Sequence, residues 1–267
     1  MVTKMFYSAA LIAALFVSLS AVSQVKSARE NVQSPGSPAV LKSPWTSTSS
    51  NLPPTPPAYC RLPGSGCLFY GGDFDSSNSN ANGLANENDL IVSDARTYTP
   101  FTVPAGRVWT VTGALGNHLS SVTVIDPPQA KWEIRTGVSS GNGGVLLSSG
   151  TASAVYHATG RSGFGLTEYT VRVPISPSVV LAAGTYWVTV IPQCTNPNNS
   201  QCGNARYFLS DVTDNPPPNG KGHEPANDSF FDSPFFGYSF APTWGSSGVC
   251  GGLGCNRFSA GIIGTSQ

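Results

Sequence analysis

The segment Lys131-Trp132-Glu133-Ile134-Arg135 alternates charged and apolar residues, and this alternation decides the expected fold. Successive side chains of a β-strand point to opposite faces, so Trp132 and Ile134 share one face and the three charged residues share the other. Burying unpaired charges is costly, which predicts one buried apolar face and one solvated charged face. Strands of this kind are typical of antiparallel sheets.

The same period-two pattern recurs from about residue 60 onward. Residues 168–173 place Tyr169, Val171 and Val173 on one face, which is expected to point inward. Further strands are expected at 107–112, 145–148, 152–157, 185–191, 207–210, 235–240 and 258–263. Gly-rich turns such as 141–144 separate them, and no helical pattern follows the N-terminal region. Regularly spaced short strands predict an all-β protein: an antiparallel β-sandwich, jelly-roll-like.

A local motif supports the sandwich. In Leu181-Ala182-Ala183-Gly184-Thr185-Tyr186, a tyrosine enters a strand directly after a glycine turn. This arrangement resembles the tyrosine corner of sandwich folds, in which the hydroxyl bonds to the backbone a few residues upstream. We therefore expect the Tyr186 hydroxyl to bond to the backbone before Gly184.

The first 23 residues have the organisation of a secretory signal peptide. Lys4 gives a positive n-region, residues 9–17 are apolar, and Ala21-Val22-Ser23 is a small-x-small cleavage pattern. The apolar run is shorter than the ~20 residues that span a bilayer. The sequence predicts removal of residues 1–23, a secreted, extracellular protein (with the periplasm as an alternative) and no membrane span in the mature chain.

Residues 24–58 form a Pro/Ser/Thr-rich tract that includes the polyproline-like segment Pro53-Pro54-Thr55-Pro56-Pro57. Too few apolar residues are present to build a core, so a disordered linker is expected there, followed by a β-sandwich domain over 59–267.

Charged residues make up 10% of the chain and balance to zero. This composition gives no electrostatic attraction to nucleic acid, and no nucleic-acid partner is expected.

Six cysteines fall into three close pairs: Cys60 and Cys67, Cys194 and Cys202, and Cys250 and Cys255. An even number of cysteines in an exported chain predicts disulfides, and local pairing is favoured among the 15 connectivities that six cysteines allow. Zinc is the alternative. However, no pair has the C-x-x-C spacing, and His118, His157 and His223 are scattered.

An ordered set of motifs covers most of residues 71–264. They are Gly71-Gly72-Asp73-Phe74-Asp75, Asn82-Gly83-Leu84-Ala85-Asn86-Glu87-Asn88-Asp89, Trp132-Glu133-Ile134-Arg135-Thr136-Gly137-Val138, Gly160-Arg161-Ser162-Gly163-Phe164-Gly165, Gly184-Thr185-Tyr186-Trp187 and Phe235-Phe236-Gly237. With these motifs the chain resembles a family of secreted bacterial β-sandwich proteins and modules of unknown function. Some relatives end in an exosortase sorting tail, which this sequence lacks, so anchoring of that kind is not expected. The resemblance implies an exported β-sandwich without an established activity.

An oxygen-rich segment is a candidate calcium site. Its candidate ligands are Asp73, Asp75, Ser77, Asn86, Glu87 and Asp89. Calcium takes six to eight oxygen ligands, which short side chains on a turn can supply. The EF-hand pattern fails, because Asn78 and Leu84 occupy its glycine and glutamate positions. The alternative is that these residues cap turns by bonding their own backbone. No cofactor other than calcium is expected.

A secreted hydrolase is the alternative function. Glycosidases need two carboxylates across a cleft. The carboxylates considered are Glu87, Asp89, Glu168, Glu224, Asp228 and Asp232. No spacing pairs them, while Glu133 and Glu168 are expected on solvated strand faces and His118 and His157 on loops or strand surfaces. Ser162 lacks the G-x-S-x-G spacing of a nucleophile elbow, so no catalytic residue is assigned.

Aromatic residues offer the remaining candidates for a binding site. The alternation in residues 236–240 places Phe236, Tyr238 and Phe240 on one face, which favours core packing over ligand stacking. Trp244 lies in a Gly/Ser-rich loop and is the better candidate for exposed ligand binding. The sequence is best interpreted as a secreted, non-enzymatic extracellular module that binds glycan or another surface polymer, or forms part of an outer structure.

Overall fold

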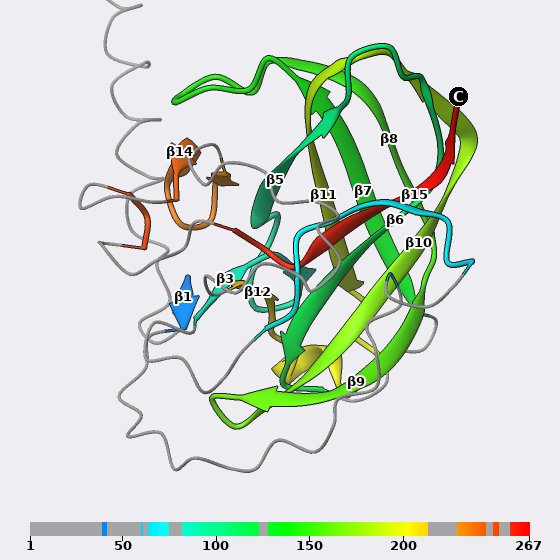
Figure 1. Cartoon of the computed structure of the whole chain (residues 1–267). Helices are drawn as coiled ribbons and strands as arrows, with labels where there is room; N and C mark the ends of the chain where they lie inside the picture. Colours follow the sequence, from blue (N-terminus) through cyan, green and yellow to red (C-terminus); the bar gives the residue numbers. More distant parts are fainter. Residues whose placement is uncertain are drawn as a thin grey trace, which may run out of the picture. The chain divides into compact units, whose positions relative to one another are not determined.

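The computed structural model describes residues 39–41, 60, 64–74, 82–122, 128–212, 229–243, 248–250 and 257–267. They belong to one compact unit, residues 37–267, built from two antiparallel sheets packed together (Figure 1). The predicted all-β sandwich is confirmed, while the jelly-roll connectivity stays a prediction. The predicted signal peptide lies outside the described residues. No helix in the described part of the chain is long and apolar enough to cross a membrane.

The first sheet is built around strand β6. Its order is β1 (Val40–Leu41), β3 (Gly83–Ala85), β12 (Tyr207–Ser210), β6 (Trp109–Ser120), β10 (Leu166–Leu181) and β9 (Val155–Gly163), with β15 (Ala260–Ser266) joining β6 to β2 (Cys67–Tyr70). One edge of β6 pairs with β10, and the other pairs with β15 and then β12.

Strand β1 lies within the tract that we expected to be disordered. At Val40 and Leu41 that expectation is wrong, because the two residues pair with Leu84 and Gly83.

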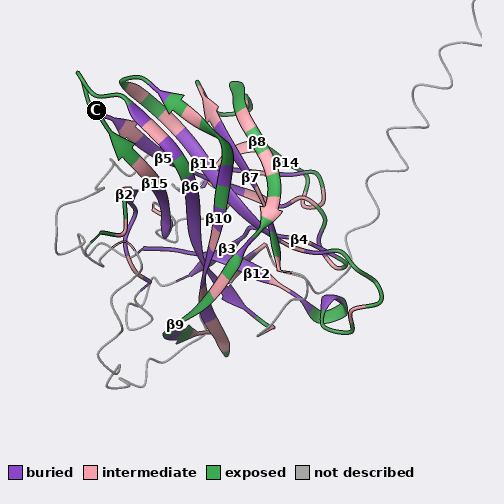
Figure 2. Cartoon of the chain, turned by 90° about the vertical axis from the view of Figure 1, so that its right-hand side faces the viewer, coloured by how far each residue is buried: buried purple, intermediate pink, exposed green. Residues whose placement is uncertain are grey.

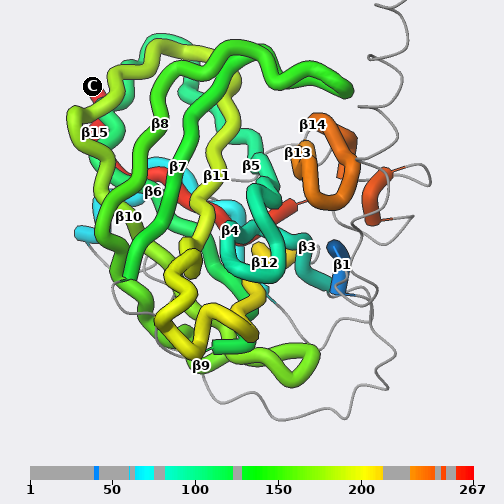
Figure 3. The backbone as a smooth tube through the Cα atoms, turned by 180° about the vertical axis from the view of Figure 1, so that it is seen from behind, coloured from blue at the N-terminus to red at the C-terminus, as the bar shows by residue number. Residues whose placement is uncertain are grey.

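The second sheet carries the segment with which the sequence analysis began. Its order is β14 (Tyr238–Pro242), β13 (Phe230–Ser233), β5 (Arg96–Val103), β11 (Gly184–Cys194), β7 (Gln129–Thr136) and β8 (Val145–Ser153). Figure 3 shows β5, β11, β7 and β8 side by side. Strand β4 (Asn88–Asp89) adds a short parallel pairing to the end of β11, and a short 3-10 helix, η2 (Cys202–Asn204), follows that strand.

The main core lies between the facing sides of the two sheets. Trp132 and Ile134 of β7 are buried there, together with Val171 and Val173 of β10, as the alternation predicts. Gly150 of β8 lies opposite Trp132, and a Cβ at this position would come within 3.1 Å of the indole ring. Glycine therefore makes room for the large side chain. Figure 2 shows the contrast between buried β6, β7 and β11 and the more exposed β8.

The face of β7 opposite the core is not solvated as expected. Glu133 is only 4% exposed, and the Tyr98 hydroxyl donates to its Oε2 at 2.8 Å. Three cations surround its carboxylate: Arg135 at 3.0 Å, Arg96 at 3.7 Å and Lys131 at 3.8 Å. The guanidinium of Arg135 also lies over the rings of Tyr98 and Phe240. Neighbouring strands thus cover this face, and the charges are buried as a paired network, which lowers the cost of burial.

Several local predictions have clear outcomes. The Tyr186 hydroxyl donates to the Ala182 carbonyl oxygen at 2.9 Å, which confirms the tyrosine corner. The disulfides Cys60–Cys67 and Cys194–Cys202 are confirmed. Cys250 is also disulfide-bonded, and its predicted partner, Cys255, lies outside the described residues.

The expected strand over residues 235–240 is wrong in its first half. Residues 234–237 form the turn between β13 and β14, and β14 begins at Tyr238. The common face predicted for Phe236, Tyr238 and Phe240 is therefore interrupted, because Phe236 lies in the turn. Tyr238 is 37% exposed and packs against Phe231, while Phe240 stacks on Tyr98.

The buried position of Trp132 leads to a stability prediction. Trp132→Ala is expected to lower the free energy of unfolding by about 3–5 kcal/mol, because it leaves a cavity between the sheets. Val180→Ala is the control, since Val180 is 66% exposed and its truncation is expected to cost less than about 0.5 kcal/mol. Denaturant unfolding of both variants measures the difference. Equal losses would contradict the assignment of Trp132 to the core.

Candidate functional site

The polar centre of the fold is the side chain of Asn86, which lies between β5 and β11. The last ladder pair of these strands is Thr99 with Val188. Two residues further along each strand, the Asn86 side chain bonds to the backbones of both strands in place of a direct hydrogen bond between them. Its Oδ1 accepts from the Thr97 N–H at 2.9 Å, and its Nδ2 donates to the Val190 carbonyl oxygen at 2.6 Å.

Asn86 also links the two sheets through His118 of β6. Its Oδ1 accepts from the Thr189 hydroxyl at 2.9 Å, and its Nδ2 lies 3.0 Å from His118 Nε2. His118 Nδ1 lies 3.1 Å from the Gly116 carbonyl oxygen, which can only accept, so Nδ1 carries the proton and Nε2 accepts from Asn86. Burial lowers the pKa of His118 to about 4, so the ring is neutral near pH 7. The expectation that His118 lies on a loop or strand surface is therefore wrong.

Glu87 and Asp89 are engaged by internal partners. Arg206 binds the Glu87 carboxylate through Nε (3.0 and 3.1 Å) and Nη2 (2.9 Å), and the Tyr207 N–H donates to it at 2.6 Å. Burial raises the pKa of Glu87, and the hydrogen bonds and charge of Arg206 oppose that shift because they favour the ionised carboxylate. Asp89 Oδ1 accepts from the N–H groups of Ile91 and Val92, which is turn-capping chemistry.

A second buried network crosses the outer side of β10. Glu168 is fully buried and accepts from Arg161 and from the Thr159 hydroxyl. Arg161 in turn lies 3.2 Å from Asp73, which also accepts from the Tyr70 hydroxyl at 2.6 Å. The predicted solvated position of Glu168 is therefore wrong, although it does lie on the face opposite Val171. Its charge is paired by Arg161 and Thr159 of β9, the neighbouring strand in the same sheet.

These contacts divide the candidate calcium ligands. Asp73 belongs to the Arg161 network, Glu87 binds Arg206 and Asn86 joins the sheets, while Asp75 and Ser77 lie outside the described residues. Within the described ranges, no group of three or more His, Cys, Asp or Glu side chains is placed to hold a metal ion. Among the described members, the turn-capping alternative fits Asp89, whereas Asp73, Asn86 and Glu87 bind groups distant in sequence. Calcium binding stays a prediction.

The other candidates of the sequence analysis are dispersed. Asp232 is paired with Arg96 at 3.5 Å, His157 is exposed on β9 and Ser162 is exposed near the end of the same strand. Glu224, Asp228 and Trp244 lie outside the described residues. Among the described candidates, Glu87 and Asp89 interact with each other, and burial raises the pKa of both. Glu168 and Asp232 belong to two other networks, which are centred on Arg161 and Arg96.

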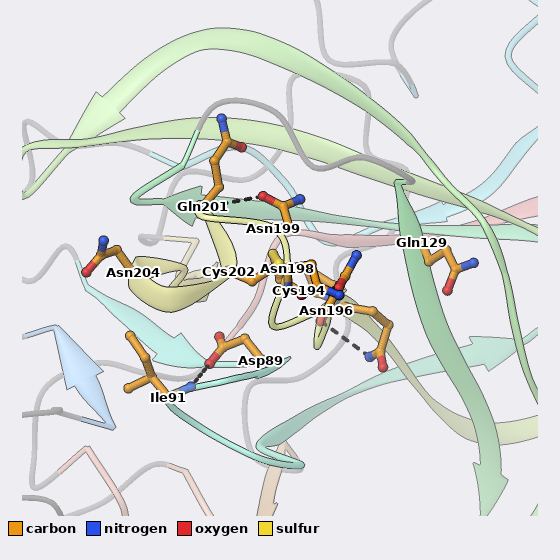
Figure 4. Close-up of a disulfide and its surroundings, with 12 residues drawn as sticks. Asp89, Ile91, Gln129, Cys194, Asn196, Asn198, Asn199, Gln201, Cys202 and Asn204 are labelled. Atoms are coloured by element: carbon orange, nitrogen blue, oxygen red, sulfur yellow. Dashed lines mark hydrogen bonds between the residues drawn. A yellow bond between two sulfur atoms is a disulfide. The ribbon is translucent and has the colours of Figure 1, made fainter.

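The surface feature that the sequence analysis missed is the loop 195–201, which we call the carboxamide loop. Its sequence is Thr195-Asn196-Pro197-Asn198-Asn199-Ser200-Gln201, and every residue except Pro197 has an uncharged hydrogen-bonding side chain. Asn196, Asn198 and Gln201 are exposed. Figure 4 shows these side chains around the disulfide Cys194–Cys202, with Gln201 and Asn204 projecting in different directions. An uncharged run between two cysteines is the sequence signal that could have identified it.

The carboxamide loop is held in one conformation by several constraints. The two cysteines at its base are buried against Ala205 and Tyr207. Asn196 Oδ1 accepts from the Asn198 N–H, and Asn199 Oδ1 accepts from the Gln201 N–H, both at 3.0 Å. Backbone bonds from Asn199 to Asn196 and from Cys202 to Asn199 close successive turns. The exposed amides are therefore presented on a rigid support.

The position of Asn86 leads to a prediction about stability. Asn86→Ala leaves the Thr97 N–H, the Val190 carbonyl and His118 Nε2 without this partner, at about 1–3 kcal/mol for each buried group. We expect a loss of more than about 3 kcal/mol in the free energy of unfolding. Asn198→Ala is the matched control on the surface, with an expected change within about 0.5 kcal/mol. A loss similar to that of the control would refute the bridging role.

The lowered pKa of His118 predicts acid sensitivity. The unfolded chain binds a proton near the ordinary pKa of about 6.5, whereas the folded ring resists protonation down to about pH 4. The contribution of neutral His118 to the free energy of unfolding is therefore fully present above pH 6.5. It is lost as the pH falls toward 4, by an amount on the order of 3 kcal/mol.

Unfolding curves of the protein and of His118→Gln between pH 7 and pH 4 isolate this contribution, because the other groups titrate in both. The gap in stability between the two is expected to shrink with falling pH. A gap independent of pH would rule out a neutral buried histidine.

A comparison of the chain with protein-family models, curated proteins and solved structures finds no match. The resemblance to secreted bacterial β-sandwich proteins stays a prediction.

Proposed function

We propose that this chain is an exported, non-enzymatic extracellular module that binds a neutral glycan through the carboxamide loop. The observation that carries the proposal is the exposed, disulfide-closed run 195–201, which has no charged residue. Export rests on the N-terminal signal pattern and on the disulfides, which form in oxidising compartments.

Carboxamide side chains match the chemistry of sugar hydroxyls. An amide offers both donors and acceptors, and a hydroxyl group does the same. Neither partner carries a charge, so binding does not require an ion to be dehydrated. Asn198 and Gln201 present such groups to solvent, and the neutral composition of the loop favours an uncharged polymer over an acidic one.

The rigidity of the loop supports a role in binding. A loop that is ordered before its ligand arrives loses less conformational entropy on association. The disulfide and the turn hydrogen bonds provide this order without a ligand. A binding loop supported by a rigid β-scaffold is a common arrangement in sandwich domains.

The hydrolase alternative has less support from the described residues. Asp73, Glu87, Glu133 and Glu168 are each paired with an arginine of the same chain. Their carboxylates stabilise the fold, and none is presented in a cleft to a substrate. Ligand binding by Trp244 stays a prediction, since that residue lies outside the described ranges.

Binding of the mature protein to insoluble neutral polysaccharides and to a glycan array tests the proposal. We expect the double variant Asn198→Ala/Gln201→Ala to lose at least about 90% of the retained protein, since each lost hydrogen bond contributes roughly 1 kcal/mol. The matched control is Asn142→Ala/Gln267→Ala, which removes the same residue types from exposed positions elsewhere. Equal retention of both variants would refute the role of the loop, and failure of the unmodified protein to bind any glycan would refute the function.

A further inference from the structure

Strand β1 forms one end of the first sheet, where it covers the outer edge of β3, as Figure 3 shows. Val40 pairs with Leu84, and the Ala85 N–H donates to the Ala39 carbonyl oxygen at 2.7 Å. The three residues of β3 are buried, and buried backbone groups need a hydrogen-bonding partner. The structure therefore shows what this edge accepts, which is the backbone of an extended peptide.

The side chains of β1 fit an apolar surface on the sandwich. Val40 is 8% exposed and belongs to the cluster that includes Leu84 and Phe208. Leu41 lies beside Gly83, and a Cβ at position 83 would lie 3.4 Å from the Leu41 Cδ1. The edge of β3 thus combines backbone pairing with room for two successive apolar side chains. Sheet edges bind extended peptides by the same combination.

The covering segment is short, and prolines bound it on both sides. Its sequence is Ser37-Pro38-Ala39-Val40-Leu41-Lys42-Ser43-Pro44. Proline has no N–H to donate and favours an extended conformation in the residue before it. Residues 42–59 connect the segment to Cys60, the next residue that the structure describes. A ladder of two residue pairs at the end of a sheet is expected to open without unfolding of the sandwich.

We propose that the outer edge of β3 is a strand-acceptor site, and that residues 39–41 of a second copy of this chain occupy it by exchange. The same segment from another copy makes the same contacts, so exchange loses no interaction. The connection through residues 42–59 gives the chain's own segment an effective concentration on the order of 1 mM, which sets the protein concentration that exchange requires. The formal net charge is zero, so two copies do not repel each other strongly. This site shares no residue with the carboxamide loop and does not depend on the proposed glycan function.

Titration of the full mature variant Val40→Asp/Leu41→Asp with a synthetic peptide of residues 36–44 tests the acceptor site. The two carboxylates keep the variant's own segment out of the apolar cluster, and the peptide is the probe for the segment of a second copy. We expect saturable binding that shifts the amide NMR signals of Leu84 and Ala85. The unmodified protein is expected to bind the peptide at least about tenfold more weakly, because its own segment competes.

The matched control is the same peptide with both aspartate substitutions, which is expected not to bind. Absence of saturable binding to the variant, equal binding of the two peptides, or shifts confined to residues outside β3 and β12 would each overturn the acceptor site.

Sedimentation of the unmodified protein tests whether a second copy is the occupant. We expect monomers at about 10 µM and a substantial fraction of dimers as the concentration approaches about 1 mM. Val40→Asp/Leu41→Asp is expected to stay monomeric at both concentrations. Val155→Asp/Val180→Asp adds the same charges at exposed positions and is expected to dimerise as the unmodified protein does. Monomers throughout, or equal dimerisation of the two variants, would overturn the second copy as the occupant.

Hydrogen exchange of the unmodified protein gives a readout that does not depend on how the variants fold. The Ala85 N–H must be released from Ala39 before copies exchange segments, so it is expected to exchange faster than the amides between β6 and β10. Equal protection would mean that the segment leaves only when the whole domain unfolds, and this result would overturn the exchange.

Discussion

The fold depends on one amide side chain placed where two strands separate. Beyond the pair Thr99 and Val188, strands β5 and β11 no longer bond to each other, and their free backbone groups would be buried without partners. Asn86 supplies an acceptor to one strand and a donor to the other, and its second donor hydrogen reaches His118 in the opposite sheet. Because a buried polar group without a partner is costly, this contact decides where the sheet opens and how the two sheets are joined.

Charge in this protein mainly stabilises the fold. The carboxylates of Glu87, Glu133 and Glu168 are buried, and each is held by at least one arginine. Charged residues make up only 10% of the chain. The carboxamide loop contains none of them, and a disulfide closes it.

The proposed function assigns a hydroxyl-rich ligand to the carboxamide loop. Exposed amides without charge favour such a polymer, which many weak hydrogen bonds would hold.

The sequence by itself determined the fold class, the inward-facing residues of the main strands, two local disulfides and the tyrosine corner. These features depend on neighbours along the chain: alternation assigns Trp132 and Ile134 to one face, and short loops bring Cys194 to Cys202. Only the tertiary structure decided what covers the opposite face, so Glu133, Glu168 and His118 were expected at the surface and are buried. Their partners, Arg96, Arg161 and Asn86, come from other strands or loops. Alternation specifies on which face a side chain lies, but burial depends on which other strands and loops pack over that face, and a local pattern does not contain their positions.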